Sequence, residues 1–99
     1  MPSMQRTAAK IVLSVYTSQT CSLCEPVKFV AKKVAKTIPG CEYEEVDIHK
    51  SGHEEYKNKY EFDIPVVEVN SHKVWGASLK EQKLRESDLR IILESYANT

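Results

Sequence analysis

The segment VYTSQTCSLCEPV, residues 15–27, holds two cysteines three positions apart, between an apolar run and a lysine-rich stretch. Such a pair serves proteins as half of a metal site, as a structural disulfide or as a redox centre. The preceding run KIVLSVYT, residues 10–17, is rich in β-branched and aromatic residues and predicts a buried strand. The elements predicted on either side of the cysteines therefore have to be used to distinguish among these three roles.

Downstream of the cysteines, apolar residues recur with the spacing of one helix face. These positions are Val27, Val30, Ala31, Val34, Ala35 and Ile38. Proline is tolerated only in a first helical turn, so Pro26 predicts a helix that begins near Ser22. The Pro39-Gly40 pair is expected to end it. This helix places Cys24 on the apolar stripe and Cys21 at or before the N-cap, so we expect an exposed Cys21 and a shielded Cys24.

That asymmetry suits thiol–disulfide exchange, in which one thiolate attacks a disulfide and a neighbouring thiol resolves the mixed disulfide. The helix N-terminus favours an anion, so it is expected to lower the pKa of Cys21 from its usual value of about 8.5. The carboxylate of Glu25 opposes this effect. We therefore expect a moderately activated thiol.

The rest of the chain predicts further elements joined by short connections. They are a strand over 42–48, a helix over 51–60, strands over 66–69 and 73–75 joined by an Asn70-Ser71 turn, a loop over 77–86, and a last helix capped by Ser87. The order is β-α-β-α-β-β-α, and its first β-α-β is a right-handed crossover with parallel strands. We expect an α/β fold with a four-stranded mixed sheet flanked by helices, over residues 10–99, preceded by a tail at 1–9.

Composition excludes several classes of protein. The apolar fraction of the 99 residues is 41%, but no run of about 18 apolar residues exists to span a membrane. The net charge is zero and no long single-sign run occurs, so nucleic-acid binding is not expected. Three cysteines are too few for a secreted disulfide scaffold and indicate a reducing compartment. We expect a cytoplasmic monomer; Arg6 and Lys10, without a nearby acid, leave the mitochondrion as an alternative location.

A metal site would need two more ligands beside the cysteine pair. The available side chains are those of Cys41, His49, His53 and His72. Zinc sites usually combine one such pair with a second close pair, and none of these four provides a clear one. Cys41 lies next to a turn and is expected to be a half-buried small apolar residue. No metal ligand is assigned.

A second feature is the run Asp63-Ile64-Pro65-Val66 at the start of a strand that should lie centrally. Proline removes a donor from the hydrogen-bond ladder, so it is confined to strand ends and edges. Pro65 is therefore either an ordinary strand-start proline or part of a cis peptide bond, which about 5–6% of X–Pro bonds adopt. A cis bond would leave the backbone of Ile64 open to pair with an extended peptide or thiol substrate.

With these motifs the chain resembles the thioredoxin superfamily, and most closely the small glutaredoxin-like proteins, over about residues 10–97. The resemblance implies that Cys21 is the nucleophile, that Cys24 resolves and that Pro65 is cis. It also implies the positions that bind substrate or glutathione, namely Ser18, Thr20, Ile64 and Pro65. The resemblance is specific for the fold and much less so for the activity.

The chain departs from the usual glutaredoxin pattern near the cysteines. Ser22-Leu23 replaces a Pro-aromatic pair, Ser18 replaces a lysine that holds a glutathione carboxylate, and Asp63 replaces a threonine. We expect a thiol–disulfide oxidoreductase without a tightly bound cofactor, with glutathione as a weakly bound reductant. Its partner would be a disulfide-containing protein or a glutathione mixed disulfide. The alternatives are a redox-inactive adaptor module of the same fold, and metal or iron–sulfur coordination through Cys21.

Overall fold

The computed structural model describes residues 10–76 and 83–97. Its elements are β2 (Ile11–Thr17), α1 (Cys24–Ala35), β3 (Cys41–Asp47), α2 (Glu54–Tyr60), β4 (Val66–Val69), β5 (His72–Gly76) and α3 (Glu86–Ala97). The predicted order and the four-stranded mixed sheet are confirmed. The predicted tail and residues 77–82 of the predicted loop lie outside this description. Within it, no helix has the length and apolarity needed to cross a membrane.

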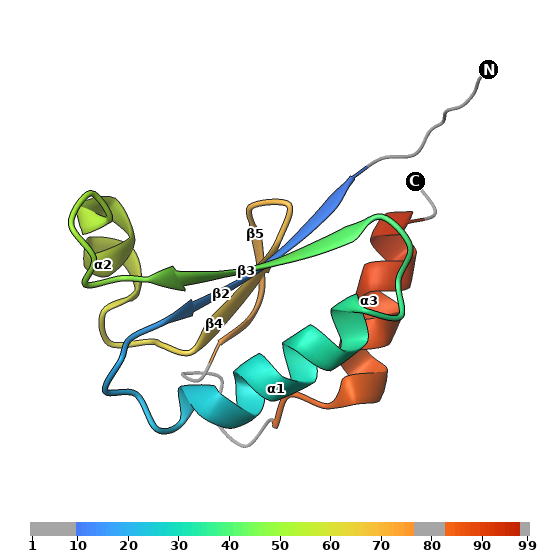
Figure 1. Cartoon of the computed structure of the whole chain (residues 1–99), viewed down its shortest axis with the longest axis horizontal. Coiled ribbons are helices and arrows are strands. Elements are labelled where there is room, and N and C mark those ends of the chain that lie inside the picture. The colour runs from blue at the N-terminus through green and yellow to red at the C-terminus, as the bar shows by residue number, and fades with distance from the viewer. Residues whose placement is uncertain (1–9, 77–82, 98–99) are drawn as a thin grey trace.

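The sheet has the strand order β3-β2-β4-β5, so β2 and β4 are central and β3 and β5 are edges (Figure 1). β2 and β3 are parallel, and α1 is the crossover between them. β4 runs antiparallel to both β2 and β5. The end of β2 therefore lies beside the start of β4, and the loops that follow and precede these strands meet at one end of the sheet.

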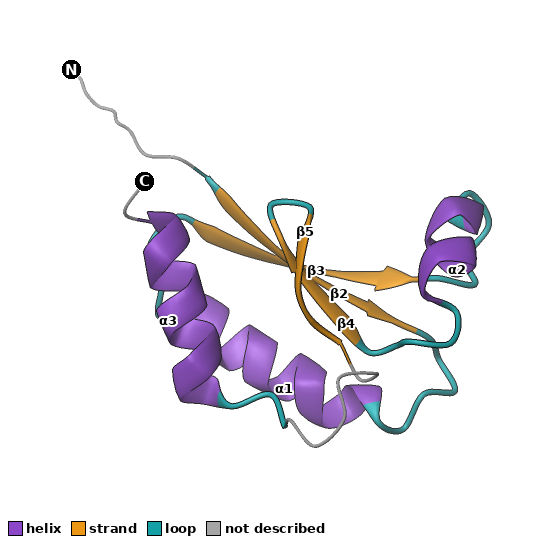
Figure 2. Ribbon diagram, turned by 180° about the vertical axis from the view of Figure 1, so that it is seen from behind, coloured by secondary structure: helices purple, strands orange, loops and turns teal. Residues whose placement is uncertain are grey.

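One face of the sheet carries the main apolar core, against α1 and α3 (Figure 2). From β2, Ile11, Leu13 and Val15 point to this side and are almost fully buried. The other members of the core are Val27, Ala31, Val34, Ala35, Ile38, Val67, Val69, Leu89 and Leu93. The alternation along β2 and the helical spacing in α1 thus bury the residues that their periods predict.

The opposite face is covered at one end only, by the short helix α2 (Figure 1). Its buried cluster is more aromatic, and it consists of Tyr16, Val46, Ile48, Tyr60 and Val66, with Tyr56 and Ile64 packed against it. Two polar residues, Ser14 and Glu68, are also buried on this face. We refer to it below as the α2 face, and to the opposite one as the α1/α3 face.

The hairpin between β4 and β5 turns at Asn70-Ser71, as predicted. Both residues have positive φ, 49° and 71°, which is the requirement of the two-residue turn that suits a twisted hairpin. Asn70 also closes the end of the central strand, because its Oδ1 accepts the N–H of Val12 at 2.8 Å and its own N–H donates to the Val12 carbonyl at 2.9 Å.

Three predicted helix starts are wrong by two or three residues. α1 begins at Cys24 and not near Ser22, because the Cys24 N–H donates to the Cys21 carbonyl in a preceding turn, at 3.2 Å. α2 begins at Glu54 because Gly52 has a φ of 92°, which an α-helix does not accommodate. α3 begins at Glu86, so Ser87 lies in its first turn and is not its N-cap.

Candidate functional site

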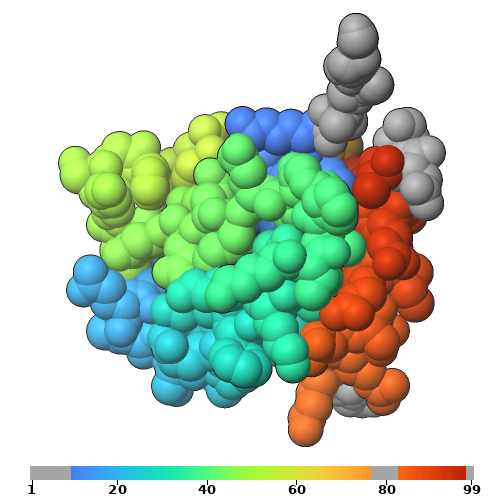
Figure 3. Space-filling view, turned by 45° about the vertical axis from the view of Figure 1, so that its right-hand side comes forward, coloured from blue at the N-terminus to red at the C-terminus, as the bar shows by residue number. Residues whose placement is uncertain are grey.

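Four segments converge at the end of the sheet where β2 stops. Thr17 pairs with Asp47 of β3, and Tyr16 pairs with Val66 of β4, so Pro65 is the residue opposite Thr17. Val66 in turn pairs with Gly76 of β5. In Figure 3 the blue segment that follows β2 lies next to the yellow-green α2 region at the same edge of the molecule. The candidate residues from the first half of the chain and those around Pro65 are therefore neighbours.

The two cysteines at this end form a disulfide, with 5.4 Å between their Cα atoms. Cys24, the first residue of α1, has no exposed surface, whereas Cys21 is half-buried in the turn before the helix. The Cys21 N–H donates to the Ser18 carbonyl at 3.2 Å, which holds this turn against the end of β2. Cys21 is less exposed than expected. It is nevertheless the one of the two cysteines that has solvent-exposed surface.

The electrostatic surroundings of Cys21 combine backbone donors with a compensated acid. Among the described residues, the N–H groups of Ser22 and Leu23 have no hydrogen-bond partner, and both residues are exposed. The carboxylate of Glu25 forms an ion pair with the Lys28 Nζ at 2.7 Å, and this hydrogen bond raises the pKa of Lys28. The acid expected to oppose a Cys21 thiolate is thus partly neutralised by a residue one turn further along α1.

Ser18 and Thr20 lie in the loop between β2 and the disulfide. Ser18 is buried, and its Oγ lies 3.3 Å from the Thr20 Oγ1. Thr20 is exposed and borders an open groove of about 710 Å³, which is also lined by Gln19, Asp47, His49 and Lys50. The sequence did not identify His49 and Lys50 as neighbours of Thr20, because they follow a different strand.

The Ile64–Pro65 peptide bond is cis, and Pro65 is fully buried at the start of β4. Ile64 is half-buried and packs against the aromatic cluster of the α2 face. Within the described part of the chain, neither its N–H nor its carbonyl has a hydrogen-bond partner. Just before it, the Asp63 N–H donates to the Tyr60 carbonyl at 2.9 Å. The Ile64 backbone is therefore held in place but left unpaired.

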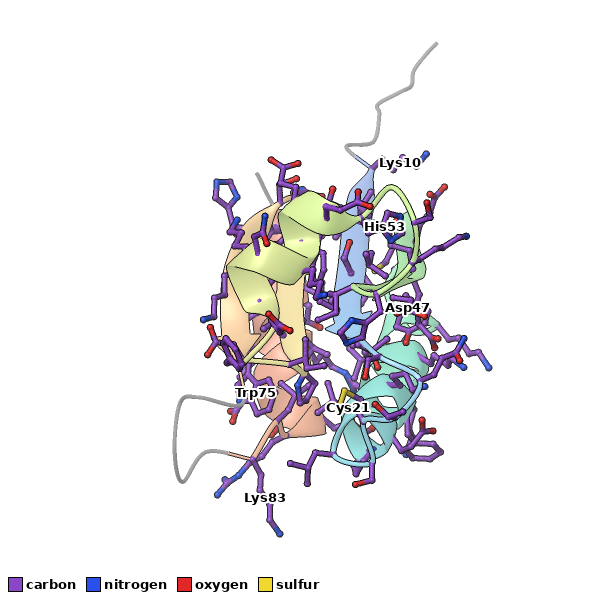
Figure 4. The ribbon with its side chains drawn as sticks, turned by 90° about the vertical axis from the view of Figure 1, so that its left-hand side faces the viewer. Lys10, Cys21, Asp47, His53, Trp75 and Lys83 are labelled. Carbon is purple, nitrogen blue, oxygen red and sulfur yellow. A yellow bond between two sulfur atoms is a disulfide. The ribbon has the colours of Figure 1, made fainter. Side chains whose placement is uncertain are left out.

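Two large apolar side chains are exposed in the loops at this end of the sheet. Leu23, between the cysteines, is 71% exposed, and Phe62, in the loop that leads to Pro65, is 91% exposed. In Figure 4, Trp75 lies to the left of Cys21 and Asp47 lies above it in projection. The sequence did not identify Leu23 or Phe62 as candidate site residues. The available signal was that each is a large apolar residue outside the predicted helix stripes and strands.

The four candidate metal partners do not gather around the cysteine pair. Across residues 10–76 and 83–97, no three His, Cys, Asp or Glu side chains come together in a way that could hold a metal ion. Cys41 pairs with Ile11 at the opposite end of β3 from Asp47. It is a half-buried free thiol, as expected, and its pKa is raised by burial and then by the nearby Glu42 carboxylate.

Comparison with known proteins agrees with this architecture. The model of the glutaredoxin-like domain (DUF836) matches residues 12–94, which include both site cysteines and the Ile64–Pro65 bond. No curated protein matches the chain at a significant level. Among solved structures, oxidised thioredoxin O2 from Arabidopsis thaliana is 15% identical with a TM-score of 0.63, and the match covers 89% of this chain and 76% of that one.

Two further thioredoxin structures are similar to the same extent. A mutant thioredoxin from Halobacterium salinarum has a TM-score of 0.64 at 16% identity, over 89% of this chain and 75% of its own. Oxidised thioredoxin from Plasmodium falciparum has a TM-score of 0.60 at 21% identity, over 89% and 82%. At these identities the likeness establishes a thioredoxin-type fold and nothing about substrate.

Proposed function

The chain belongs to the glutaredoxin-like domain family, and we propose that it is a thiol–disulfide oxidoreductase whose redox centre is the pair Cys21 and Cys24. The observation that carries the proposal is the unequal burial of the two residues. A fully buried Cys24 is out of reach of a large substrate, so exchange with a partner has to take place at the Cys21 sulfur. Cys24 is adjacent and is available only to Cys21, as a resolving thiol requires.

The proposed reaction starts from the reduced pair. The Cys21 thiolate attacks one sulfur of a substrate disulfide, a new Cys21–substrate disulfide forms, and the other substrate sulfur leaves as a thiolate that takes up a proton. Cys24 then loses its proton and attacks the Cys21 Sγ, which releases the second substrate thiol and forms the Cys21–Cys24 disulfide. Two electrons and two protons pass to the substrate, and an external thiol reductant must return them.

A disulfide-bearing polypeptide is the substrate class that the surroundings of Cys21 favour. Leu23 and Phe62 offer apolar surface to a partner, and burying large apolar side chains is a main source of binding free energy. The unpaired N–H and carbonyl of Ile64 would pair with an extended chain as a strand does. Both features suit a peptide segment on either side of the attacked cysteine.

Glutathione is proposed as the reductant, bound weakly. Two glutathione molecules would supply the two electrons, and each carries carboxylates that need cationic partners. Ser18 offers no charge and Asp63 repels an anion, while His49 and Lys50 are the basic side chains in the groove beside Thr20. Exposed ion pairs contribute little binding free energy, so contacts of this kind would bind glutathione weakly and release it quickly.

The proposal is tested first by a redox titration of the Cys21–Cys24 pair in glutathione buffers, read by thiol labelling and mass spectrometry. A midpoint between about −180 and −270 mV would place the pair among glutaredoxin- and thioredoxin-type catalysts. A disulfide that does not form, or one with a potential below about −300 mV, would contradict the proposal. It would leave the adaptor module as the better description.

Substitution of the cysteines separates their roles. Cys21→Ser is expected to abolish reduction of insulin disulfides, because no accessible nucleophile remains. Cys24→Ser is expected to accumulate a mixed disulfide with the substrate, detected as a covalent adduct by mass spectrometry. Cys41→Ser is the matched control, since it removes a thiol at the far end of β3 and should leave the rate unchanged. Unchanged turnover in Cys21→Ser would refute the assignment.

A further inference from the structure

We propose that Glu68 is a positioning residue, whose carboxylate holds the loop that carries Cys21 and the loop that carries Ile64 at a fixed distance from each other. The inference rests on the proposed function, because it concerns the alignment of a substrate chain with the attacking sulfur. Glu68 lies in the central strand β4 and is only 4% exposed on the α2 face.

Both oxygens of this carboxylate are occupied by tyrosine hydroxyls. The Tyr16 O–H donates to Oε1 at 2.8 Å, and the Tyr60 O–H donates to Oε2 at 2.5 Å. The two rings also pack against each other, with 5.1 Å between their centroids. Burial, followed by the hydrogen bond to Glu68, raises the pKa of both hydroxyls, so both remain donors at neutral pH.

The two tyrosines belong to the two halves of the site. Tyr16 precedes Thr17, the last residue of β2, from which the chain enters the turn of Cys21. Tyr60 ends α2, and its carbonyl accepts the Asp63 N–H directly before Ile64. Ile64 also packs against the cluster to which both rings belong. One carboxylate thus connects the nucleophile loop with the backbone that is proposed to receive the substrate.

A carboxylate at this position is not what stability alone would select. The other residues of β4 are all valines, and replacing a buried ionic group by a well-packed apolar one is often neutral or stabilising. Lys59 Nζ lies 3.9 Å from Oε2 and 5.1 Å from the Tyr60 ring centroid, which compensates part of the negative charge. What an apolar residue could not supply is two directed contacts that set the distance between Tyr16 and Tyr60.

Hydrogen exchange tests the inference without relying on activity. The variants are Tyr60→Phe and Glu68→Gln, and the matched control is Tyr43→Phe, which removes a hydroxyl that donates to Glu45 on the opposite face. Loss of one hydrogen bond should speed amide exchange about 2- to 10-fold at the hydrogen-bonded amides of Glu61 and Asp63 for Tyr60→Phe, and at that of Cys21 as well for Glu68→Gln. The control should leave both loops unchanged.

Kinetics supplies the second readout. With insulin as substrate, Tyr60→Phe should raise KM about 2- to 10-fold at unchanged kcat, because it disturbs substrate alignment and not the thiol. Reaction of the reduced protein with dithiobis-nitrobenzoate, a small disulfide that needs only an accessible Cys21, should keep its rate. Unchanged exchange in both loops, an equal change in the control, or an unchanged insulin KM would each overturn the inference.

The two proposals fail in different ways. If the wild-type protein reduces no disulfide, the proposed function fails, and the exchange experiment still decides whether Glu68 couples the two loops. If the wild type is active and the loops of Tyr60→Phe exchange as in the wild type, only the positioning role fails. Tyr60→Phe keeps the ring and its packing, so it serves even if Glu68→Gln does not fold.

Discussion

The two faces of the central sheet are built from different chemistry. The buried cluster of the α1/α3 face consists of aliphatic residues. The α2 face is smaller and contains three tyrosines and a buried glutamate. An aliphatic core holds the fold by non-directional burial, whereas hydrogen bonds fix distances between particular atoms. The face with the smaller core is thus the one whose hydrogen bonds connect the end of β2 with the end of α2 through Glu68.

The largest effect is expected on the α1/α3 face. Leu93→Ala removes a side chain with no exposed surface and should lower the free energy of unfolding by about 2–5 kcal/mol, through lost burial and the cavity left behind. Ile91→Ala on the same helix is the control, because Ile91 is 64% exposed and should cost about 0.5 kcal/mol or less. Urea unfolding of the oxidised protein measures both free energies of unfolding. Equal losses in the two variants would contradict the assignment of Leu93 to a core that stabilises the fold by burial.

A smaller effect is expected on the α2 face, and it should depend on how many partners are removed. Glu68→Leu leaves two buried hydroxyls without their acceptor, and we expect it to cost about 1–3 kcal/mol, the penalty of one hydroxyl that stays unpaired. The triple variant Tyr16→Phe, Tyr60→Phe, Glu68→Leu removes all three hydrogen-bonding groups together. Its free energy of unfolding should lie within about 1 kcal/mol of that of the wild type. If the triple variant is much less stable than Glu68→Leu, the network contributes to the stability of the fold, and a purely positioning role is contradicted.

The smallest effect is confined to alkaline pH. Burial and then hydrogen bonds to glutamates raise the pKa of three tyrosines, Tyr16 and Tyr60 through Glu68 and Tyr43 through Glu45. Above about pH 10, where an unfolded tyrosine loses its proton, the unfolded chain therefore binds fewer protons than the folded one. Stability should be fully present below that pH and should fall as the pH rises above it.

The alkaline effect also separates the two faces. Replacing Tyr16 and Tyr60 with Phe removes two of the three shifted groups, so the loss of stability between about pH 10 and 11 should become shallower. Tyr43→Phe removes the single shifted hydroxyl of the other face and should change the slope less. Urea unfolding at a series of pH values measures the slopes, and a double variant with the slope of the wild type would contradict the assignment of these shifts.

The sequence predicted much of the fold because its signals are local. The strand Val66–Val69 was predicted with its observed bounds, and the Asn70-Ser71 turn follows from the chemistry of two-residue hairpins. The helix starts were less accurate, because Gly52 and the turn at Cys21 are decided by backbone conformations that a periodic pattern does not encode. The pairing of Cys21 with Cys24 and the place of Pro65 were also within reach, because both are marked by short motifs.

The Glu68 network was out of reach for a different reason. Tyr16 and Tyr60 are 52 and 8 positions away from Glu68, so no local period connects the three residues. A glutamate in a four-residue strand of valines was the available signal, and it is ambiguous, since an acid in a strand usually faces solvent. Only the strand order, with β2 beside β4, places the first tyrosine next to the carboxylate.

The edge strand β3 has a consequence for how the protein behaves in concentrated solution. One of its long sides is unpaired in the sheet, and its exposed residues are Glu42, Glu44 and Glu45. Charges on an open edge discourage pairing with the edge of another molecule, which would otherwise lead to aggregation. That protection is electrostatic, so it weakens where dissolved salt screens the charges. The chain is therefore expected to associate strand to strand more readily at high salt than at low ionic strength.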